Sequence, residues 1–153
     1  GWDMVSHPQR SRSFRELSPA EQRANIRQSK EWLRTNGFEG GADFIIWPFG
    51  RYNQSALDIA SQYHYMGFVT VGGPTGAISD PLVVGRTDGD KVASARRALE
   101  FAAKYDQLAV LMYHDVTGSG GAVSPTAFAE TMDYIEQLGL DVVTASSHWQ
   151  SMS

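Results

Sequence analysis

The sequence Leu-Ala-Val-Leu-Met-Tyr-His-Asp occupies residues 108–115. It is apolar or aromatic without a break as far as Tyr113, and His114 and Asp115 follow at once. An unbroken apolar run is typical of a strand covered on both faces, as in a parallel sheet flanked by helices. In such sheets, ligands and catalytic groups gather at the carboxyl ends of the strands. We therefore expect His114 and Asp115 to lie at such an edge.

Segments with strand and helix patterns alternate along the rest of the chain. Apolar runs predict further strands at residues 2–6, 43–47, 68–71, 82–85 and 140–144. Helical spacing predicts helices at residues 19–36, 53–64, 90–105 and 125–138, and residues 145–153 are interpreted as a polar tail. Ser18 and Glu21 form a capping box at the start of the first helix, and Gly37 ends it. This alternation predicts an α/β fold with a parallel sheet, in one domain over residues 1–153.

The composition narrows the class of protein. Of the 153 residues, 42% are hydrophobic and 20% are charged, as in an ordinary globular domain. A net charge of −4 without a Lys/Arg cluster argues against nucleic acid or an anionic membrane as a partner. No apolar run approaches the roughly 18 residues that span a bilayer. The absence of cysteine excludes disulfides and a cysteine nucleophile.

Chemically active side chains follow several predicted strands, and parallel pairing would bring them to one edge of the sheet. They are His7, Trp47, Pro48, Phe49, Gly50, Arg86, Asp88, His114, Asp115 and His148. A single histidine after a strand is more often a loop or core residue, but three histidines, an arginine and two acids favour a ligand or active site. Trp47 could stack against a sugar ring, although a tryptophan is more often core. His64 keeps the core spacing of its predicted helix and is interpreted as packing or surface.

Several of these residues belong to motifs that occur in a fixed order. Residues 1–7 place a glycine, an acid and a small polar residue before His7, and residues 47–50 read Trp-Pro-Phe-Gly. Residues 111–114, Leu-Met-Tyr-His, end in His114, and the segments at residues 15–18, 124–128 and 140–144 complete the series. Together they resemble the second, third and fifth motifs, with their flanking segments, of the polysaccharide deacetylases (carbohydrate esterase family four). The resemblance covers nearly the whole chain and depends on the order and spacing of the motifs.

The resemblance implies a distorted (β/α) barrel of the deacetylase type, partial because the first strand or strands are missing. It implies zinc or another divalent metal, held by one aspartate and two histidines, that polarises an acyl carbonyl and activates water. It makes His7 a metal ligand and His114 the catalytic general acid that protonates the leaving amine. The predicted substrate-binding residues are Trp47, Pro48, Phe49, Gly50, Arg86 and Asp88.

Three departures from the family pattern bear on activity. The family's paired aspartates, which serve as base and as one metal ligand, lie before the second motif, and this chain begins at that motif. Ser11 stands in place of the second ligand histidine, and a hydroxyl is a poor zinc ligand. Ile46 stands in place of the arginine that normally holds the base. Only His7 remains from the ligand set, so we expect impaired or lost deacetylation, and no metal if catalysis is lost.

Two functions of different classes follow. One is a metal-dependent polysaccharide deacetylase whose aspartates come from an upstream segment; the other is a non-catalytic glycan-binding or structural domain of a larger surface assembly. Either way we expect a glycan with N-acetyl or O-acetyl groups as partner, and an upstream segment or another subunit that completes the barrel. An extracellular or cell-envelope location follows from such substrates.

A serine-hydrolase site made of His114, Asp115 and either Ser119 or Ser146 is the weakest alternative. Neighbouring side chains point apart in an extended segment, and the sequence has no Gly-x-Ser-x-Gly turn after a strand.

Overall fold

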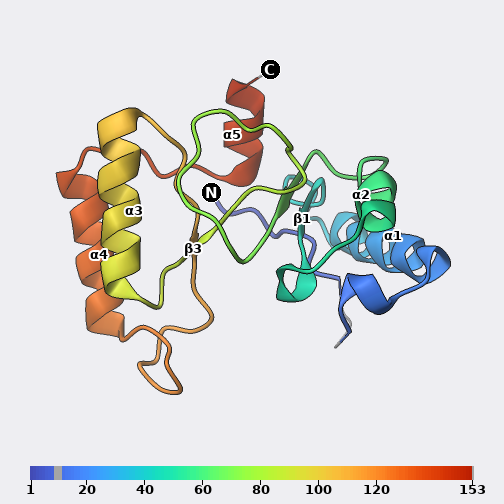
Figure 1. The fold of residues 1–153 in the computed structure, drawn as a ribbon, viewed down its shortest axis with the longest axis horizontal. Helices are drawn as coiled ribbons and strands as arrows, with labels where there is room; N and C mark the ends of the chain where they lie inside the picture. The colour runs from blue at the N-terminus through green and yellow to red at the C-terminus, as the bar shows by residue number, and fades with distance from the viewer. Residues whose placement is uncertain (9–11, 153) are drawn as a thin grey trace. The chain divides into compact units, whose positions relative to one another are not determined.

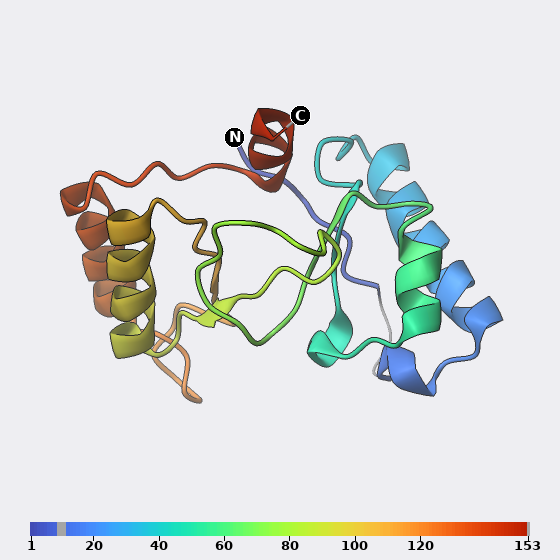
Figure 2. The same ribbon diagram turned by 45° about the horizontal axis from the view of Figure 1, so that its top comes forward.

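The structure is a computed structural model that describes residues 1–8 and 12–152. These residues form five α-helices, two 3-10 helices and four short strands, which confirms the α/β class (Figures 1 and 2). Their contacts divide the chain into two units, each described here by itself. The first unit comprises Gly1–Val69, Asp80–Val84 and Val143–Ser153, and the second comprises Thr70–Ser79 and Gly85–Val142. No helix in the described part of the chain is long and apolar enough to cross a membrane.

A short parallel sheet organises the first unit. β1 (Phe44–Ile46) pairs in parallel with β2 (Met66–Phe68), as the alternation of strands and helices predicted. Single parallel bridges at Ser6 and Val84 extend the pairing on either side. The strands predicted at residues 2–6 and 82–85 are therefore reduced to one paired residue each.

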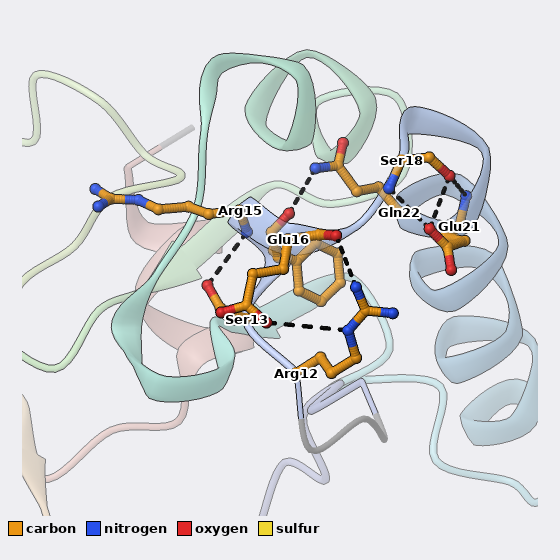
Figure 3. A network of polar contacts seen from close by, with 8 residues as sticks. Arg12, Ser13, Arg15, Glu16, Ser18, Glu21 and Gln22 are labelled. Atoms are coloured by element: carbon orange, nitrogen blue, oxygen red, sulfur yellow. Dashed lines mark hydrogen bonds and ion pairs between the residues drawn. The ribbon is translucent and has the colours of Figure 1, made fainter.

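Local sequence signals determine where the helices of the first unit begin. α1 (Pro19–Thr35) starts at the predicted capping box: the Ser18 side chain accepts from the Glu21 amide, and the Glu21 carboxylate accepts from the Ser18 amide at 2.8 Å (Figure 3). Gly37 follows α1 with a φ of 83°, in the left-handed region that glycine adopts without strain. Asn53 caps α2 (Gln54–Ala60), which ends four residues before the predicted boundary at residue 64.

A buried glutamine joins the helices of this unit. The side chain of Gln22 is fully buried, and its amide donates to the Phe14 carbonyl at 2.7 Å and to the Asn53 side chain at 3.1 Å. Phe14 lies in the 3-10 helix η1 (Phe14–Glu16), where the Ser13 hydroxyl accepts from the Arg15 amide (Figure 3). Because a buried amide is costly unless it is hydrogen-bonded, Gln22 fixes η1 and the start of α2 against α1.

Trp47 is part of the hydrophobic core of the first unit. Its ring is fully buried, packs edge-on against Phe14 at 5.5 Å between centroids, and donates its indole N–H to the Leu82 carbonyl at 2.8 Å. Gly67 makes this approach possible, because a Cβ there would lie 2.5 Å from the Leu82 oxygen. A tryptophan buried in this way satisfies its polar edge while it fills the core.

The second unit consists of two helices and a second pair of strands. β3 (Thr87–Asp88) and β4 (Leu111–Met112) pair in parallel. α3 (Val92–Tyr105) and α4 (Pro125–Gln137) lie side by side, yellow and orange in Figures 1 and 2. Ser124 caps α4, as its position before Pro125 predicted.

Other boundaries differ from the predictions. Residues 108–113 are half-buried rather than covered on both faces, and in the described chain β4 pairs with β3 on one edge. Residues 140–144 form no strand; Val142 is 78% exposed, and no strand among the described residues pairs with this segment. The predicted tail is instead α5 (Ala145–Ser151), because the Thr144 side chain accepts from the Ser147 amide and caps it. The barrel itself stays a prediction.

His64 is a buried titratable group in the first unit. It is 4% exposed, consistent with its interpretation as a packing residue. Burial, together with the nearby ammonium of Lys30, lowers the pKa of His64 from 6.5 to about 4, and the Asp43 carboxylate opposes the shift. Lys30 is itself bonded to Asp43 and to the Tyr63 carbonyl.

Acid should therefore destabilise the chain through His64. Between pH 6.5 and about 4 the unfolded chain binds a proton at this residue more readily than the folded chain does, so stability falls as the pH falls. We expect a loss on the order of 2 kcal/mol between about pH 7 and pH 5 that His64→Leu largely removes. Urea unfolding at both pH values measures it. Between pH 7 and 8 the free energy of unfolding should change with pH in the same way in wild type and variant. If both lose the same free energy of unfolding toward pH 5, the prediction is contradicted.

Candidate active site

The pairing of β3 with β4 brings an acid and a histidine together in the second unit. Asp88 lies opposite Met112, and the Gly89 amide continues the ladder by donating to the Met112 carbonyl at 2.8 Å. Asp90 and His114 lie two residues beyond Asp88 and Met112 along the two segments. Their side chains meet, with 2.7 Å between the Asp90 Oδ2 and the His114 Nδ1.

The environments of these two side chains differ in a way that suits acid–base chemistry. The Asp90 side chain is 9% exposed, whereas that of His114 is 70% exposed. The hydrogen bond with His114 holds the pKa of the Asp90 carboxyl below its usual range; the Val123 amide adds to this effect, and burial opposes it. A carboxylate that accepts from Nδ1–H fixes the tautomer and orientation of the imidazole. Nε2 is then the nitrogen that can exchange a proton with a ligand.

A cavity of about 370 Å³ lies beside this pair. It is lined by Asp88, Asp90, Lys91, His114, Asp115, Ser119, Gly120, Gly121 and Ala122. The lining residues come from the ends of β3 and β4 and from the loop that leads to α4. The cavity therefore lies where the carboxyl ends of parallel strands meet, as predicted for His114 and Asp115.

Asp90 also anchors the glycine-containing loop that forms one wall of the cavity. Its second carboxylate oxygen accepts from the Val123 amide at 3.3 Å. Within the loop, the Gly118 amide donates to the Val123 carbonyl at 3.0 Å, and Gly118 has a φ of 74°. One buried carboxylate thus holds both the histidine and the base of the loop.

Asp115 does not act as the partner of His114. Its carboxylate accepts from the Val116 amide at 2.7 Å and from the Thr117 hydroxyl at 3.1 Å. The two neighbouring side chains point to different partners, as the extended segment predicted, and this weakens the serine-hydrolase alternative built on Asp115.

The other predicted residues of the second unit are Arg86 and Asp88. Asp88 lines the cavity, forms an ion pair with Lys91 at 3.0 Å and accepts from the Asp90 amide at 3.1 Å. Arg86 is half-buried just before β3, and burial lowers the pKa of its guanidinium. Arg86 is not among the residues that line the cavity.

The predicted substrate-binding residues of the first unit differ in exposure. Trp47 and Pro48 are fully buried. Of the two alternatives for Trp47, a core position or stacking on a sugar, this burial favours the core. Phe49 is 60% exposed in the 3-10 helix η2 (Pro48–Gly50) and has a φ of 57°, unusual for a non-glycine residue. Gly50 also has a positive φ, of 64°. Of these four residues, Phe49 is exposed and Gly50 is half-buried, and their part in substrate binding stays a prediction.

The described residues do not supply the metal site that the resemblance implies. His7 is exposed, and Ser11 lies outside the described residues. Within residues 1–8 and 12–152, no group of three or more His, Asp or Glu side chains is arranged to hold a metal ion. His148 lies in α5 of the first unit, where its Nε2 is buried and has no hydrogen-bond partner in the described part of the chain. A zinc site needs about three protein ligands, and these residues do not form one.

Asp90 is the site residue that the sequence reading missed. It was assigned to the first turn of a helix, where an acid is unremarkable. The structure starts α3 two residues later, at Val92, and uses Asp90 as the continuation of β3. The signal that could have found it is the spacing Asp88-Gly89-Asp90 after a strand, because residues two apart point to the same side.

Removing the histidine should change the titration of its partner. In His114→Leu the Asp90 carboxyl loses its principal hydrogen bond, so its pKa should rise toward the ordinary value. Carbon-13 NMR of the aspartate carboxyl carbons through the acid range measures this. Lys91→Met removes a charge from the same cavity wall but no hydrogen bond to Asp90, and it should have a smaller effect. An unchanged Asp90 titration in His114→Leu would refute the pairing.

Comparison with known proteins finds similarity among solved structures. No protein-family model matches the chain, and the comparison with curated proteins gives no match. Among solved structures, the chain is similar to the Streptococcus pyogenes deacetylase PplD in complex with acetate, with 21% sequence identity and a TM-score of 0.50. The match covers 84% of this chain and 43% of that one, so the chain spans less than half the length of its relative. At this identity the likeness establishes the fold: the chain shares it with a deacetylase.

Proposed function

We propose that this chain is a polysaccharide deacetylase-like domain that acts on or binds a glycan with N-acetyl or O-acetyl groups. Its metal-dependent deacetylation is impaired or lost. The observation that carries the proposal is the bond between Asp90 and His114, 2.7 Å long, at the mouth of a cavity on a fold shared with a deacetylase. His114 is the same residue that the fifth-motif resemblance assigns as the general acid.

The chemistry available to this pair is proton transfer. When His114 is protonated, Nδ1–H remains bonded to the Asp90 carboxylate, and Nε2–H is the proton that can pass to a leaving amine. Asp90 stabilises the imidazolium and keeps the ring in one orientation. The burial of Asp90 and the exposure of His114 place the anchor inside the unit and the donor toward a ligand.

The case for impaired catalysis rests on what surrounds this proton donor. Ser11 and Ile46 depart from the family pattern, and the described residues contain no arrangement of three side chains that could hold a metal. Ile46 lies in β1 next to the buried Trp47. Without a Lewis acid and a base, a general acid alone does not supply the attacking water.

Two versions of the proposal differ in what completes the site. In one, an upstream segment of the chain contributes the paired aspartates and the domain is a slow enzyme. In the other, which we favour, the domain binds glycan or serves as a structural part of a larger surface assembly. Both place the protein outside the cell or in its envelope, and both allow an upstream segment or another subunit to complete a barrel.

Zinc content, acetate release and glycan binding separate these versions in one set of assays. The chain is equilibrated with excess zinc, its bound metal is measured, and it is mixed with an N-acetylated glucosamine oligosaccharide. We expect less than one zinc per chain, acetate at the background level, and shifts of cavity amides on oligosaccharide addition that His114→Leu weakens. Lys104→Gln is the control, because Lys104 lies at the far end of α3 from the cavity.

The outcomes bear on separate parts of the proposal. Stoichiometric zinc with acetate release that His114→Leu abolishes would overturn impaired catalysis and establish the enzyme. Absence of both acetate release and oligosaccharide binding would contradict a role with acetylated glycans. Equal loss of oligosaccharide binding in Lys104→Gln and His114→Leu would contradict the cavity as the binding site.

A further inference from the structure

Tyr113, the residue before His114, makes an unusually close contact with Gly89, the residue that follows β3. The ring of Tyr113 lies against the backbone of Gly89, and a Cβ on Gly89 would lie 2.5 Å from the Tyr113 Cζ and 2.6 Å from its Cε1. These distances are shorter than any real Cβ contact, so a side chain at residue 89 would have to displace the ring. Gly89 is buried, and its amide is already committed to the Met112 carbonyl.

The Tyr113 ring is also confined from the side of α4. It packs edge-on against Phe128, with 5.0 Å between ring centroids and an interplanar angle of 79°. Burial raises the pKa of the Tyr113 hydroxyl, as expected for a phenol removed from water. A close-packed ring between a backbone and another aromatic ring cannot move aside without a cost.

This contact lies one residue before the functional pair. Gly89 precedes Asp90, Tyr113 precedes His114, and the ladder ends with the bond between Gly89 and Met112. Beyond that point no hydrogen bond between two backbone groups joins the two segments in the described chain, although the His114 backbone N–H helps to lower the pKa of the Asp90 carboxyl. The contact of the Tyr113 ring with Gly89 is therefore a packing contact that sets the spacing of the segments one residue before Asp90 and His114 meet.

We propose that Tyr113 and Gly89 are positioning residues: the ring seated on the glycine holds His114 in bonding distance of Asp90. The consequence of this positioning for activity rests on the proposed role of His114. The positioning itself depends only on contacts within the second unit. Residue 89 must be glycine for a steric reason: the Tyr113 ring fills the space that a side chain at this position would need.

Substitutions at both positions test this by the Asp90 titration. Gly89→Ala should displace the ring, break the bond between Asp90 and His114, and raise the pKa of Asp90 in the direction that His114→Leu does. Tyr113→Phe keeps the ring and should leave the titration as in wild type. In Gly89→Ala with Tyr113→Leu, the smaller side chain makes room for the new methyl group, so the Asp90 titration should return toward wild type. Carbon-13 NMR of the carboxyl carbons is the measurement, with amide spectra to verify the fold.

If Tyr113 and Gly89 only stabilised the fold, the Asp90 titration would not differ among these variants in this way. If Gly89→Ala does not fold, Tyr113→Ala serves instead, because loss of the ring should loosen the same bond and raise the pKa of Asp90. A wild-type Asp90 titration in folded Gly89→Ala or Tyr113→Ala would overturn the proposal, as would a Tyr113→Phe variant that behaves like Gly89→Ala. The titration requires neither glycan nor acetate release, so failure of the proposed function and failure of the positioning role are distinguishable.

Discussion

The parallel pairing of β3 with β4 is the constraint on which the candidate site depends. Two residue pairs and two backbone bonds, from Thr87 to Val110 and from Gly89 to Met112, align the two segments. That register makes Asp90 and His114 meet, and a slip by one residue would turn one of them to the opposite face. The pair in turn organises the cavity, because Asp90 bonds to the histidine with one oxygen and to the Val123 amide with the other.

Much of the fold could be predicted because the signals are local. The capping box at Ser18 and Glu21 and the left-handed glycine at Gly37 act within one turn of the chain, and both are present as predicted. Strand extents were less predictable, since a strand needs a partner that the sequence does not specify. Residues 140–144 have the apolar pattern of a strand but lie unpaired with Val142 exposed, and Thr144 caps a helix instead.

Part of the candidate site was also predictable from a local signal. An apolar run ending in His114 indicates the end of a buried strand, and this needs no knowledge of the rest of the chain. Its partner Asp90 depends on the register between two strands, which sequence spacing alone does not determine. Trp47 shows the opposite case: a motif suggested a sugar contact, whereas the carbonyl of Leu82 and the absence of a Cβ at Gly67 give the indole a buried place.

The register of β3 and β4 can be measured directly by scalar couplings across backbone hydrogen bonds in a long-range NMR experiment on the labelled chain. This register predicts a coupling between the Gly89 amide nitrogen and the Met112 carbonyl carbon, and another between the Thr87 amide nitrogen and the Val110 carbonyl carbon. Coupling of the Gly89 amide to a different carbonyl, or the absence of both couplings in the folded chain, would contradict it. In that case nothing in the backbone would bring Asp90 to His114.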